Sequence, residues 1–309
     1  MASSKTSGFC GLDYSVIEEL NNGDIALLGA PNATPYEPGK PSHSEDAPDA
    51  IRDISRKFAN WLDHHDFDTD CSLVPFASAR LRDLGNLDTD PSTPASNRES
   101  IASAVREILL ANATPIVLGG DDSVPIPMFN AFSNSGPIWI VQIDAHIDWR
   151  QERFGEPMGW SSTMRRASEL PGVEGIVQIG ARGVGSATRQ DLDDAIQWGA
   201  KIVTARQVFE RGIKQPLNVV PDGSRVVIAL DCDAFDPSIM PGVMASTPGG
   251  LNYWHMIEIL EVLSAKSLIV GCSIVELAPQ RDVGNLTTLT ASRIVSCMIA
   301  AIHKSQTNT

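Results

Sequence analysis

Short apolar runs rich in valine, isoleucine and leucine recur along the chain, and each is followed by glycine, aspartate or proline. Continuous apolar runs of this length, without alternating polar residues, predict strands that are buried on both faces. Such strands are predicted over residues 25–28, 116–118, 138–143, 176–179, 202–203, 226–230 and 268–275. Segments of helical length are predicted over residues 47–61, 97–112, 163–169, 188–199, 253–265 and 288–303.

Strands that alternate with helices predict an α/β fold with a doubly wound parallel sheet and right-handed crossovers. Ile101, Val105 and Ile108 fall on one face of a predicted helix, and Asn252 is a candidate N-cap for another. No linker divides the chain, so we expect residues 1–309 to form a single domain. Ligands of such sheets bind beyond the carboxyl ends of the strands, and the residues that follow each apolar run are therefore the candidates for chemistry.

Composition narrows the classes of function. The 309 residues carry 24 Lys+Arg and 38 Asp+Glu, a net charge of −14, so we expect no nucleic-acid partner, which would need clustered positive charge. No apolar run approaches the roughly 18 residues of a membrane span, and the start of the chain has no hydrophobic signal core. Five scattered cysteines without a C-x-x-C spacing are typical of reduced thiols. We therefore expect a cytoplasmic protein with no membrane partner.

Acidic residues and one histidine follow four of the predicted strands. G-G-D-D-S occupies 119–123, D-A-H-I-D occupies 144–148, D-C-D-A-F-D-P occupies 231–237, and Glu276 follows the last predicted strand. Each motif alone is weak evidence, because acidic residues often follow strands as loop residues or helix caps. Their joint occurrence on successive strand ends predicts a site. The candidate metal ligands are Asp122, Asp144, His146, Asp148, Asp231 and Asp233.

Electrostatics indicates what such a cleft would hold. Five carboxylates close together would repel one another and raise one another's pKa values unless cations held them. Two divalent metal ions would neutralise most of that charge, and carboxylates mixed with imidazole suit Mn²⁺, with Ni²⁺, Co²⁺ and Zn²⁺ as alternatives. A metal pair about 3.5–4 Å apart lowers the pKa of a shared water enough to give hydroxide near neutral pH. We expect Asp144 and Asp231 to bridge the ions, with Asp122 and Asp148 on one and His146 and Asp233 on the other.

These motifs resemble those of the ureohydrolases, the family of arginase, agmatinase and the guanidino-acid hydrolases. P-G-G-L at 248–251 and V-E-L-A-P at 275–279 extend the match, and M-R-R-A at 164–167 is similar to the agmatinase branch. The resemblance implies a three-layer α/β/α fold with a mainly parallel sheet, arginase-like, and a binuclear Mn²⁺ site. It also implies hydrolysis of a guanidino group to urea and an amine, and assembly into homo-oligomers, trimers or hexamers.

Two positions depart from the family's pattern. Asp122 stands where the family's first metal ligand is normally a histidine, in G-G-D-H-S, and Trp160-Ser161 stands at the family's His-Gly. An indole offers no hydrogen-bond acceptor, but it supplies an apolar wall or a cation–π face to a guanidinium. Trp160 is therefore a candidate substrate-binding residue. We expect small or alkylated guanidines, biguanides included, to be preferred over guanidines with a charged terminal group.

The expected reaction is attack of a metal-bridging hydroxide on the guanidinium carbon of a small cationic guanidino substrate. Asp148 would carry the proton to the leaving amine, and Glu276 would bind the cation by charge-assisted hydrogen bonds. Agmatine and guanidino acids are the substrates that the resemblance implies.

Two other functions remain open. Loss of the first histidine is compatible with a non-catalytic subunit of a hetero-oligomer. A metal-dependent deacetylase shares the sheet and the Asp/His ligands, but it uses one metal and a histidine pair, which six scattered histidines do not provide. Metal analysis together with urea release from a panel of guanidines would separate the three functions.

Overall fold

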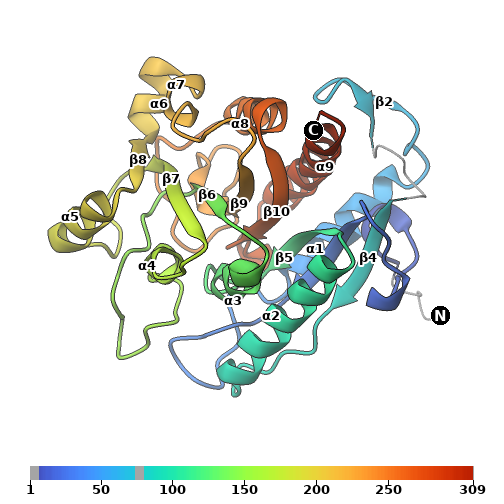
Figure 1. Ribbon diagram of the computed structural model, residues 1–309. Coiled ribbons are helices and arrows are strands. Elements are labelled where there is room, and N and C mark those ends of the chain that lie inside the picture. The colour runs from blue at the N-terminus through green and yellow to red at the C-terminus, as the bar shows by residue number, and fades with distance from the viewer. Residues whose placement is uncertain (1–6, 74–79, 309) are drawn as a thin grey trace.

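The fold is organised around a parallel sheet of eight strands in the order β4-β1-β5-β10-β9-β6-β7-β8 (Figure 1). A computed structural model describes residues 7–73 and 80–308. Every pair of neighbouring strands in this sheet is parallel. The strands are β1 (Ile25–Ala30), β4 (Leu81–Asn86), β5 (Thr114–Gly119), β6 (Ile138–Ile143), β7 (Val173–Ala181), β8 (Lys201–Thr204), β9 (Arg225–Asp231) and β10 (Leu268–Val275). A separate antiparallel pair consists of β2 (His65–Asp66) and β3 (Cys71–Ser72).

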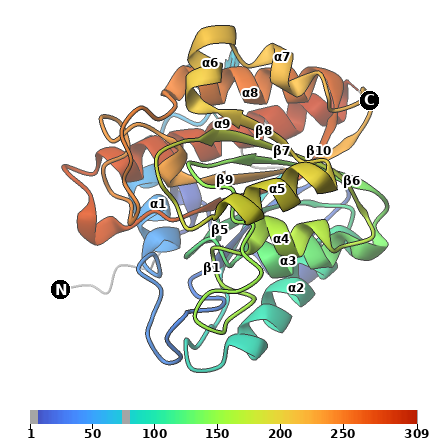
Figure 2. The same ribbon diagram turned by 90° about the vertical axis from the view of Figure 1, so that its left-hand side faces the viewer.

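Helices cover both faces of the sheet, as the end-on view in Figure 2 shows. One face carries α1 (Ala47–Ser55), α6 (Ala205–Arg211), α7 (Lys214–Leu217), α8 (Tyr253–Lys266) and α9 (Leu286–Thr307). The other carries α2 (Pro94–Leu110), α3 (Pro125–Ala131), α4 (Thr163–Ser168) and α5 (Arg189–Trp198). Short 3₁₀ helices are η1 (Phe9–Gly11), η2 (Ile17–Glu19), η3 (Arg56–Phe58), η4 (Phe132–Asn134), η5 (Cys232–Ala234) and η6 (Pro279–Arg281). The predicted three-layer α/β/α fold with a parallel sheet is confirmed.

The apolar pattern located every strand that is buried on both faces and missed the edge strand β4. Its residues alternate between buried and partly exposed positions, and its buried Asp83 pairs with Arg52 of α1 at 2.9 Å. An edge strand has only one neighbouring strand, so it keeps polar residues that mask it as a strand. The pattern also missed the short helices α3, α6 and α7, and it extended α1 to residue 61 although that helix ends at Ser55. Asn252 caps α8 as predicted, because its side chain accepts from His255 N at 2.9 Å.

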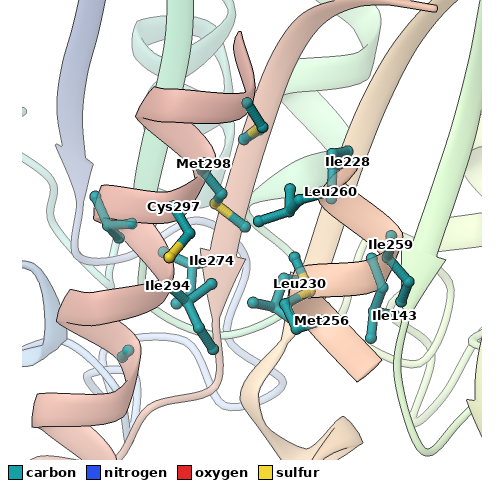
Figure 3. Packing of buried hydrophobic residues seen from close by; sticks show 14 of the residues in the cluster. Ile143, Ile228, Leu230, Met256, Ile259, Leu260, Ile274, Ile294, Cys297 and Met298 are labelled. Atoms are coloured by element: carbon teal, nitrogen blue, oxygen red, sulfur yellow. The ribbon is translucent and has the colours of Figure 1, made fainter. Parts of the chain in front are cut away.

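The core between the sheet and helices α8 and α9 holds the central strands in place. Figure 3 shows Leu230 of β9 and Ile274 of β10 beside Leu260 of α8 and Met298 of α9. All four side chains are at most 3% exposed. Burying one such side chain is worth roughly 1.5–3 kcal/mol. The strand ends that carry the acidic motifs are thus supported by a rigid core.

Among the residues that the structure describes, α9 is the one helix long and apolar enough to be considered as a membrane span. An 18-residue window within this 22-residue helix has a mean hydropathy of 1.3, so by length and composition it could cross a membrane. Polar residues such as Arg293 interrupt the window, so it is not a continuous apolar run. In the fold, 72% of that apolar window is buried. The helix packs against α1, α8 and β10, so its apolar residues belong to the protein core.

Candidate metal centre

Four neighbouring strands in the middle of the sheet deliver the acidic residues to one place. The order β5-β10-β9-β6 places these four carboxyl ends side by side. Asp122 follows β5, Glu276 follows β10, Asp231 ends β9 and Asp144 follows β6. All four side chains are at most 5% exposed. The sequence predicted which residues reach this edge, and the fold brings them together.

The side chains form two possible ligand sets that share one residue. Asp144, His146 and Asp233 make one set, and Asp122, Asp144 and Asp231 make the other. Within each set one ligand atom of every residue lies within 4.8 Å of the others. Five of the six predicted ligands therefore converge, and Asp144, one of the two residues expected to bridge the ions, is the residue that the two sets share. Asp231 belongs to one set only.

Asp148 lies in neither ligand set, although it lines the same cleft. Its Oδ2 accepts a hydrogen bond from Gln142 Nε2 at 2.9 Å, and the same nitrogen donates to Asp144 Oδ2 at 2.7 Å. One amide thus orients two of the carboxylates. Hydrogen bonds of this kind to ligating groups tune a metal site nearly as much as the ligands do.

Sequence reasoning missed Gln142, although a signal for it exists. The tetrapeptide Ile-Val-Gln-Ile occurs at 140–143 and again at 176–179, so each of two apolar strands contains a lone amide. Gln142 and Gln178 are register partners on β6 and β7. Gln178 Nε2 donates to Gln142 Oε1 at 2.6 Å and to the carbonyl of Ile147 at 2.8 Å. This pair of amides fixes the orientation of Gln142.

The donor groups fit a pair of divalent cations. Asp122 Oδ2 is buried and has no hydrogen-bond partner, whereas buried polar atoms are normally satisfied. A cation bound between Asp122, Asp144 and Asp231 would satisfy that oxygen. Carboxylate oxygens with one imidazole are ligands that suit divalent first-row metals.

The pKa values show how strongly the site needs positive charge. Burial and the charges of neighbouring carboxylates raise the pKa values of Asp122, Asp148 and Asp231 well above 3.8. Burial alone would lower the pKa of His146, but hydrogen bonds and charge from Asp144 and Asp233 raise it to about 12. Its Nδ1 lies 3.1 Å from Asp233 Oδ2. In the absence of metal, the imidazole therefore binds a proton and partly neutralises the carboxylates.

Arg182 supports the loop that carries Asp233. Its guanidinium donates to the carbonyls of Asp233 at 2.7 Å, Ala234 at 3.0 Å and Phe235 at 3.1 Å. It also donates to the carbonyl of Thr247 at 2.8 Å. One cation thus ties together two loops and satisfies carbonyls that η5 leaves free.

Two site residues adopt left-handed backbone conformations. Asp148 has φ 42° and Glu276 has φ 66°, which costs of order 1–3 kcal/mol for a residue other than glycine. Glu276 is held there because its N–H donates to the carbonyl of Gly120 at 2.9 Å. Its Oε1 in turn accepts from Asp122 N at 2.9 Å. Strain of this kind concentrates at functional sites.

His43 is a cleft residue for which the sequence shows no local signal. It lies in the Pro/Gly-rich loop 31–48, and its Nε2 is 2.5 Å from Glu276 Oε2. Burial lowers the pKa of His43, but the hydrogen bond and charge of Glu276 and the charge of Asp121 outweigh it, so the pKa is raised above 6.5. Gln280 Nε2 donates to the His43 carbonyl at 2.6 Å and anchors the loop.

Trp160, which the sequence made a candidate for substrate binding, lies at the mouth of the acidic cleft. It is half-buried and lines a cleft of about 330 Å³ together with Glu276 and the ligand residues. Its ring centroid is 4.1 Å from that of Tyr36 and 5.7 Å from that of His43. A Cβ on Gly159 would lie 2.1 Å from the Tyr36 ring, so only glycine permits this contact.

Comparisons with known proteins find a family model, sequence relatives and solved structures that match this chain over most of its length. The arginase family model matches residues 23–300. An uncharacterised 32.2 kDa protein of Methanothermus fervidus is 30% identical over 295 residues, which cover 94% of this chain and 96% of the relative. An agmatinase of Pyrococcus horikoshii is 28% identical, with coverage of 91% and 93%. The solved structure of proclavaminate amidino hydrolase from Streptomyces clavuligerus has the same fold, with a TM-score of 0.80, 24% identity and 97% coverage of both chains.

Removal of the Asp231 carboxylate tests the ligand sets. We expect Asp231→Ala to lower bound metal below that of the wild type, measured by elemental analysis after dialysis. Asp231→Asn should do the same while keeping the hydrogen bond that Asp233 N donates to position 231 at 2.7 Å. Loss of a residue that supports a ligand lowers metal affinity about 10–100-fold, so loss of the ligand Asp231 should lower it at least as much. Asp222→Asn, at an exposed side chain before β9, is the control. Unchanged metal content in both Asp231 variants would contradict the assignment.

The raised pKa values predict that the stability of the metal-free protein depends on pH. Folded Asp122 keeps its proton at pH values where the unfolded chain has lost it, so its contribution to stability falls as pH rises above 3.8. We expect Asp122→Asn to raise the Tm of chelator-treated protein, and to raise it more at pH 8 than at pH 5. One pKa unit corresponds to about 1.4 kcal/mol and to roughly 2–4 °C in Tm. Calorimetry that finds a lower Tm for the variant at pH 8 would contradict this prediction.

Proposed function

The chain belongs to the arginase family, and from this membership we propose that it is a hydrolase that cleaves a C–N bond of a guanidino compound to give urea and an amine. One observation carries the proposal. Two ligand sets that share Asp144 lie in the same cleft as Glu276, a buried carboxylate outside both sets. The relationship to an agmatinase supports the same reaction.

We propose two divalent cations as cofactors, Mn²⁺ in the first instance and Ni²⁺ as the alternative. The set of Asp122, Asp144 and Asp231 offers only oxygen ligands, whereas His146 adds a nitrogen to the other set. Oxygen ligands favour hard cations such as Mn²⁺, and imidazole favours Ni²⁺. When bound, the two ions would supply an activated water for attack on the guanidinium carbon.

We assign the chemistry of the substrate to three side chains of the cleft. Glu276 would bind the guanidinium, because its two oxygens accept charge-assisted hydrogen bonds. Asp148 would carry a proton to the leaving amine, since its carboxylate lines the cleft beside Asp144. Trp160 would form an apolar wall against the substrate. Whether each residue has this role is tested by substitution.

The assembly and location of the protein are also proposals. We propose a homo-oligomer, trimer or hexamer, with a hetero-oligomer as the alternative. A cytoplasmic location is supported by the five cysteines, all of which are free, as expected for a reducing compartment.

Urea release from guanidines by metal-loaded protein tests the proposed function. We expect urea from at least one member of a panel with methyl, aminobutyl and carboxypropyl tails after loading with Mn²⁺ or Ni²⁺. Glu276→Gln should lower kcat/KM about 10- to 100-fold, because a hydrogen bond to a charged group is worth about 1.5–3 kcal/mol. Glu99→Gln, at an exposed position of α2, should match the wild type. If metal binds but no guanidine releases urea, the non-catalytic subunit becomes the better hypothesis.

The contact between His43 and Glu276 predicts how substrate binding depends on pH. Protonated His43 and a guanidinium would compete for one carboxylate, so binding of the substrate favours neutral His43. The raised pKa of His43 places this competition above pH 6.5. We expect KM to rise by up to about tenfold per unit as pH falls below that pKa.

His43→Gln retains a donor for Glu276 but does not titrate. In this variant the dependence of KM on pH should flatten, whereas a merely structural role would shift KM equally at all pH values. Steady-state kinetics between pH 6 and 9 makes the comparison. A variant that keeps the wild-type pH profile of KM would show that His43 does not compete with the substrate.

A further inference from the structure

A second, more apolar cavity adjoins the metal cleft and gives room for a substrate tail. It measures about 500 Å³, and its wall includes Tyr36, Phe154 and Pro35. It shares His43, Trp160 and Met244 with the metal cleft. A guanidinium bound at Glu276 would therefore extend its tail past Trp160 into this cavity.

Arg153 lies at the boundary between the two cavities. It lines the metal cleft, and its guanidinium stacks on rings that wall the outer cavity, 5.6 Å from the Tyr36 centroid and 5.0 Å from the Phe154 centroid. Its polar contact is a hydrogen bond to Ser161 Oγ at 3.4 Å. Within residues 7–73 and 80–308, no carboxylate forms an ion pair with it.

The other cationic groups of the two cavities all have acidic partners. His146 lies 3.1 Å from Asp233 in the proposed metal centre, and His43 pairs with Glu276 at 2.5 Å. Asp148 accepts a hydrogen bond from the Gln142 amide instead. In the outer cavity Glu37 pairs with Lys40 at 3.2 Å. Among the described residues that line these cavities, Arg153 is the cationic side chain that forms no ion pair. It therefore offers an unpaired positive charge at the place that a substrate tail would pass.

A strained tight turn positions Arg153 and Phe154. Arg153 and Glu156 exchange backbone hydrogen bonds of 3.1 and 3.0 Å across a tight turn. Phe154 and Gly155 in this turn have φ 56° and 81°. Positive φ angles at both central residues are typical of a two-residue hairpin turn. Such turns favour Asn or Gly, yet this one places a phenylalanine that is 80% exposed. Its ring packs at right angles to Tyr36, 5.7 Å away, and against the Arg153 guanidinium.

We propose that Arg153 selects substrates by the charge at the end of their tails, binding a carboxylate and rejecting an ammonium. This inference rests on the proposed function and names a substrate class for the same site. An ammonium-ended tail would meet an unpaired cation in a half-buried cleft, whereas a carboxylate would give Arg153 its missing partner in a charge-assisted contact. Trp160 alone predicts that either charge is disfavoured. Arg153 separates the two signs of charge.

The test uses three guanidines of similar length that differ in the charge at the end: 4-guanidinobutyrate, its neutral amide, and 4-aminobutylguanidine. In the metal-loaded wild type, we expect kcat/KM for the carboxylate to exceed that for the ammonium compound by about 10- to 100-fold, the range for one charge-assisted contact. Arg153→Met should shrink this ratio towards one, Arg153→Lys should keep much of it, and Arg153→Glu should invert it. Ratios are compared because a general loss of activity cancels in them.

Calorimetric binding of the same compounds provides a second measurement, independent of turnover. The carboxylate should bind most tightly, the amide less tightly and the ammonium compound most weakly, even if no urea is released. This order of affinities without urea release would contradict the proposed function but support the inference about Arg153. Arg206→Glu, the same charge change at an exposed position of α6, should leave the ratios at wild-type values. Equal binding of the three compounds by the wild type, or an unchanged order in Arg153→Glu, would overturn the inference.

Discussion

The mutual repulsion of buried carboxylates is the constraint on which the rest of this structure depends. Asp122, Asp144 and Asp231 lie close enough to share a ligand sphere, at most 4% exposed, where unpaired charge is costly. Burial and the charges of neighbouring carboxylates raise their pKa values, so without cations these groups tend to hold protons. The arrangement is tolerable because the central strands are fixed by the apolar core, and it becomes favourable when two divalent cations occupy the site.

Much of the surrounding structure serves to keep these carboxylates in place. The amide of Gln142 orients Asp144 together with the neighbouring Asp148. Arg182 holds the loop that follows β9 by donating to its carbonyls. Glu276 is kept in a left-handed conformation by backbone contacts to the β5 loop. These supporting residues hold the strands and loops around the site in place. The carboxylates therefore keep their remaining acceptor positions for cations and substrate.

The cleft has an acidic floor, formed by the aspartates of the metal centre and Glu276, and an aromatic mouth that carries the positive charge of Arg153. The floor matches a positively charged guanidinium and the metal ions that would activate water. The mouth combines the rings of Tyr36, Phe154 and Trp160 with Arg153, which forms no ion pair within the described part of the chain. In the proposed function, the guanidinium end of a substrate would bind at the acidic floor, and its tail would meet the aromatic mouth and Arg153. Members of one fold family can differ in specificity through such residues on loops while keeping the reaction centre unchanged.

Local sequence determined the layers of the fold and the chemistry of the site, and only the tertiary structure decided which neighbours the site residues have. Apolar runs predicted the inner strands, and D-A-H-I-D with its companion motifs predicted the acidic edge, because strand burial and strand ends leave direct signals in the order of residues. The edge strand β4 and the strand order β5-β10-β9-β6 leave no such signal, since neighbours in a sheet are set by packing. His43 and Arg153 were missed for the same reason: a charged residue in a loop gains its role only from the side chains that a distant segment places beside it.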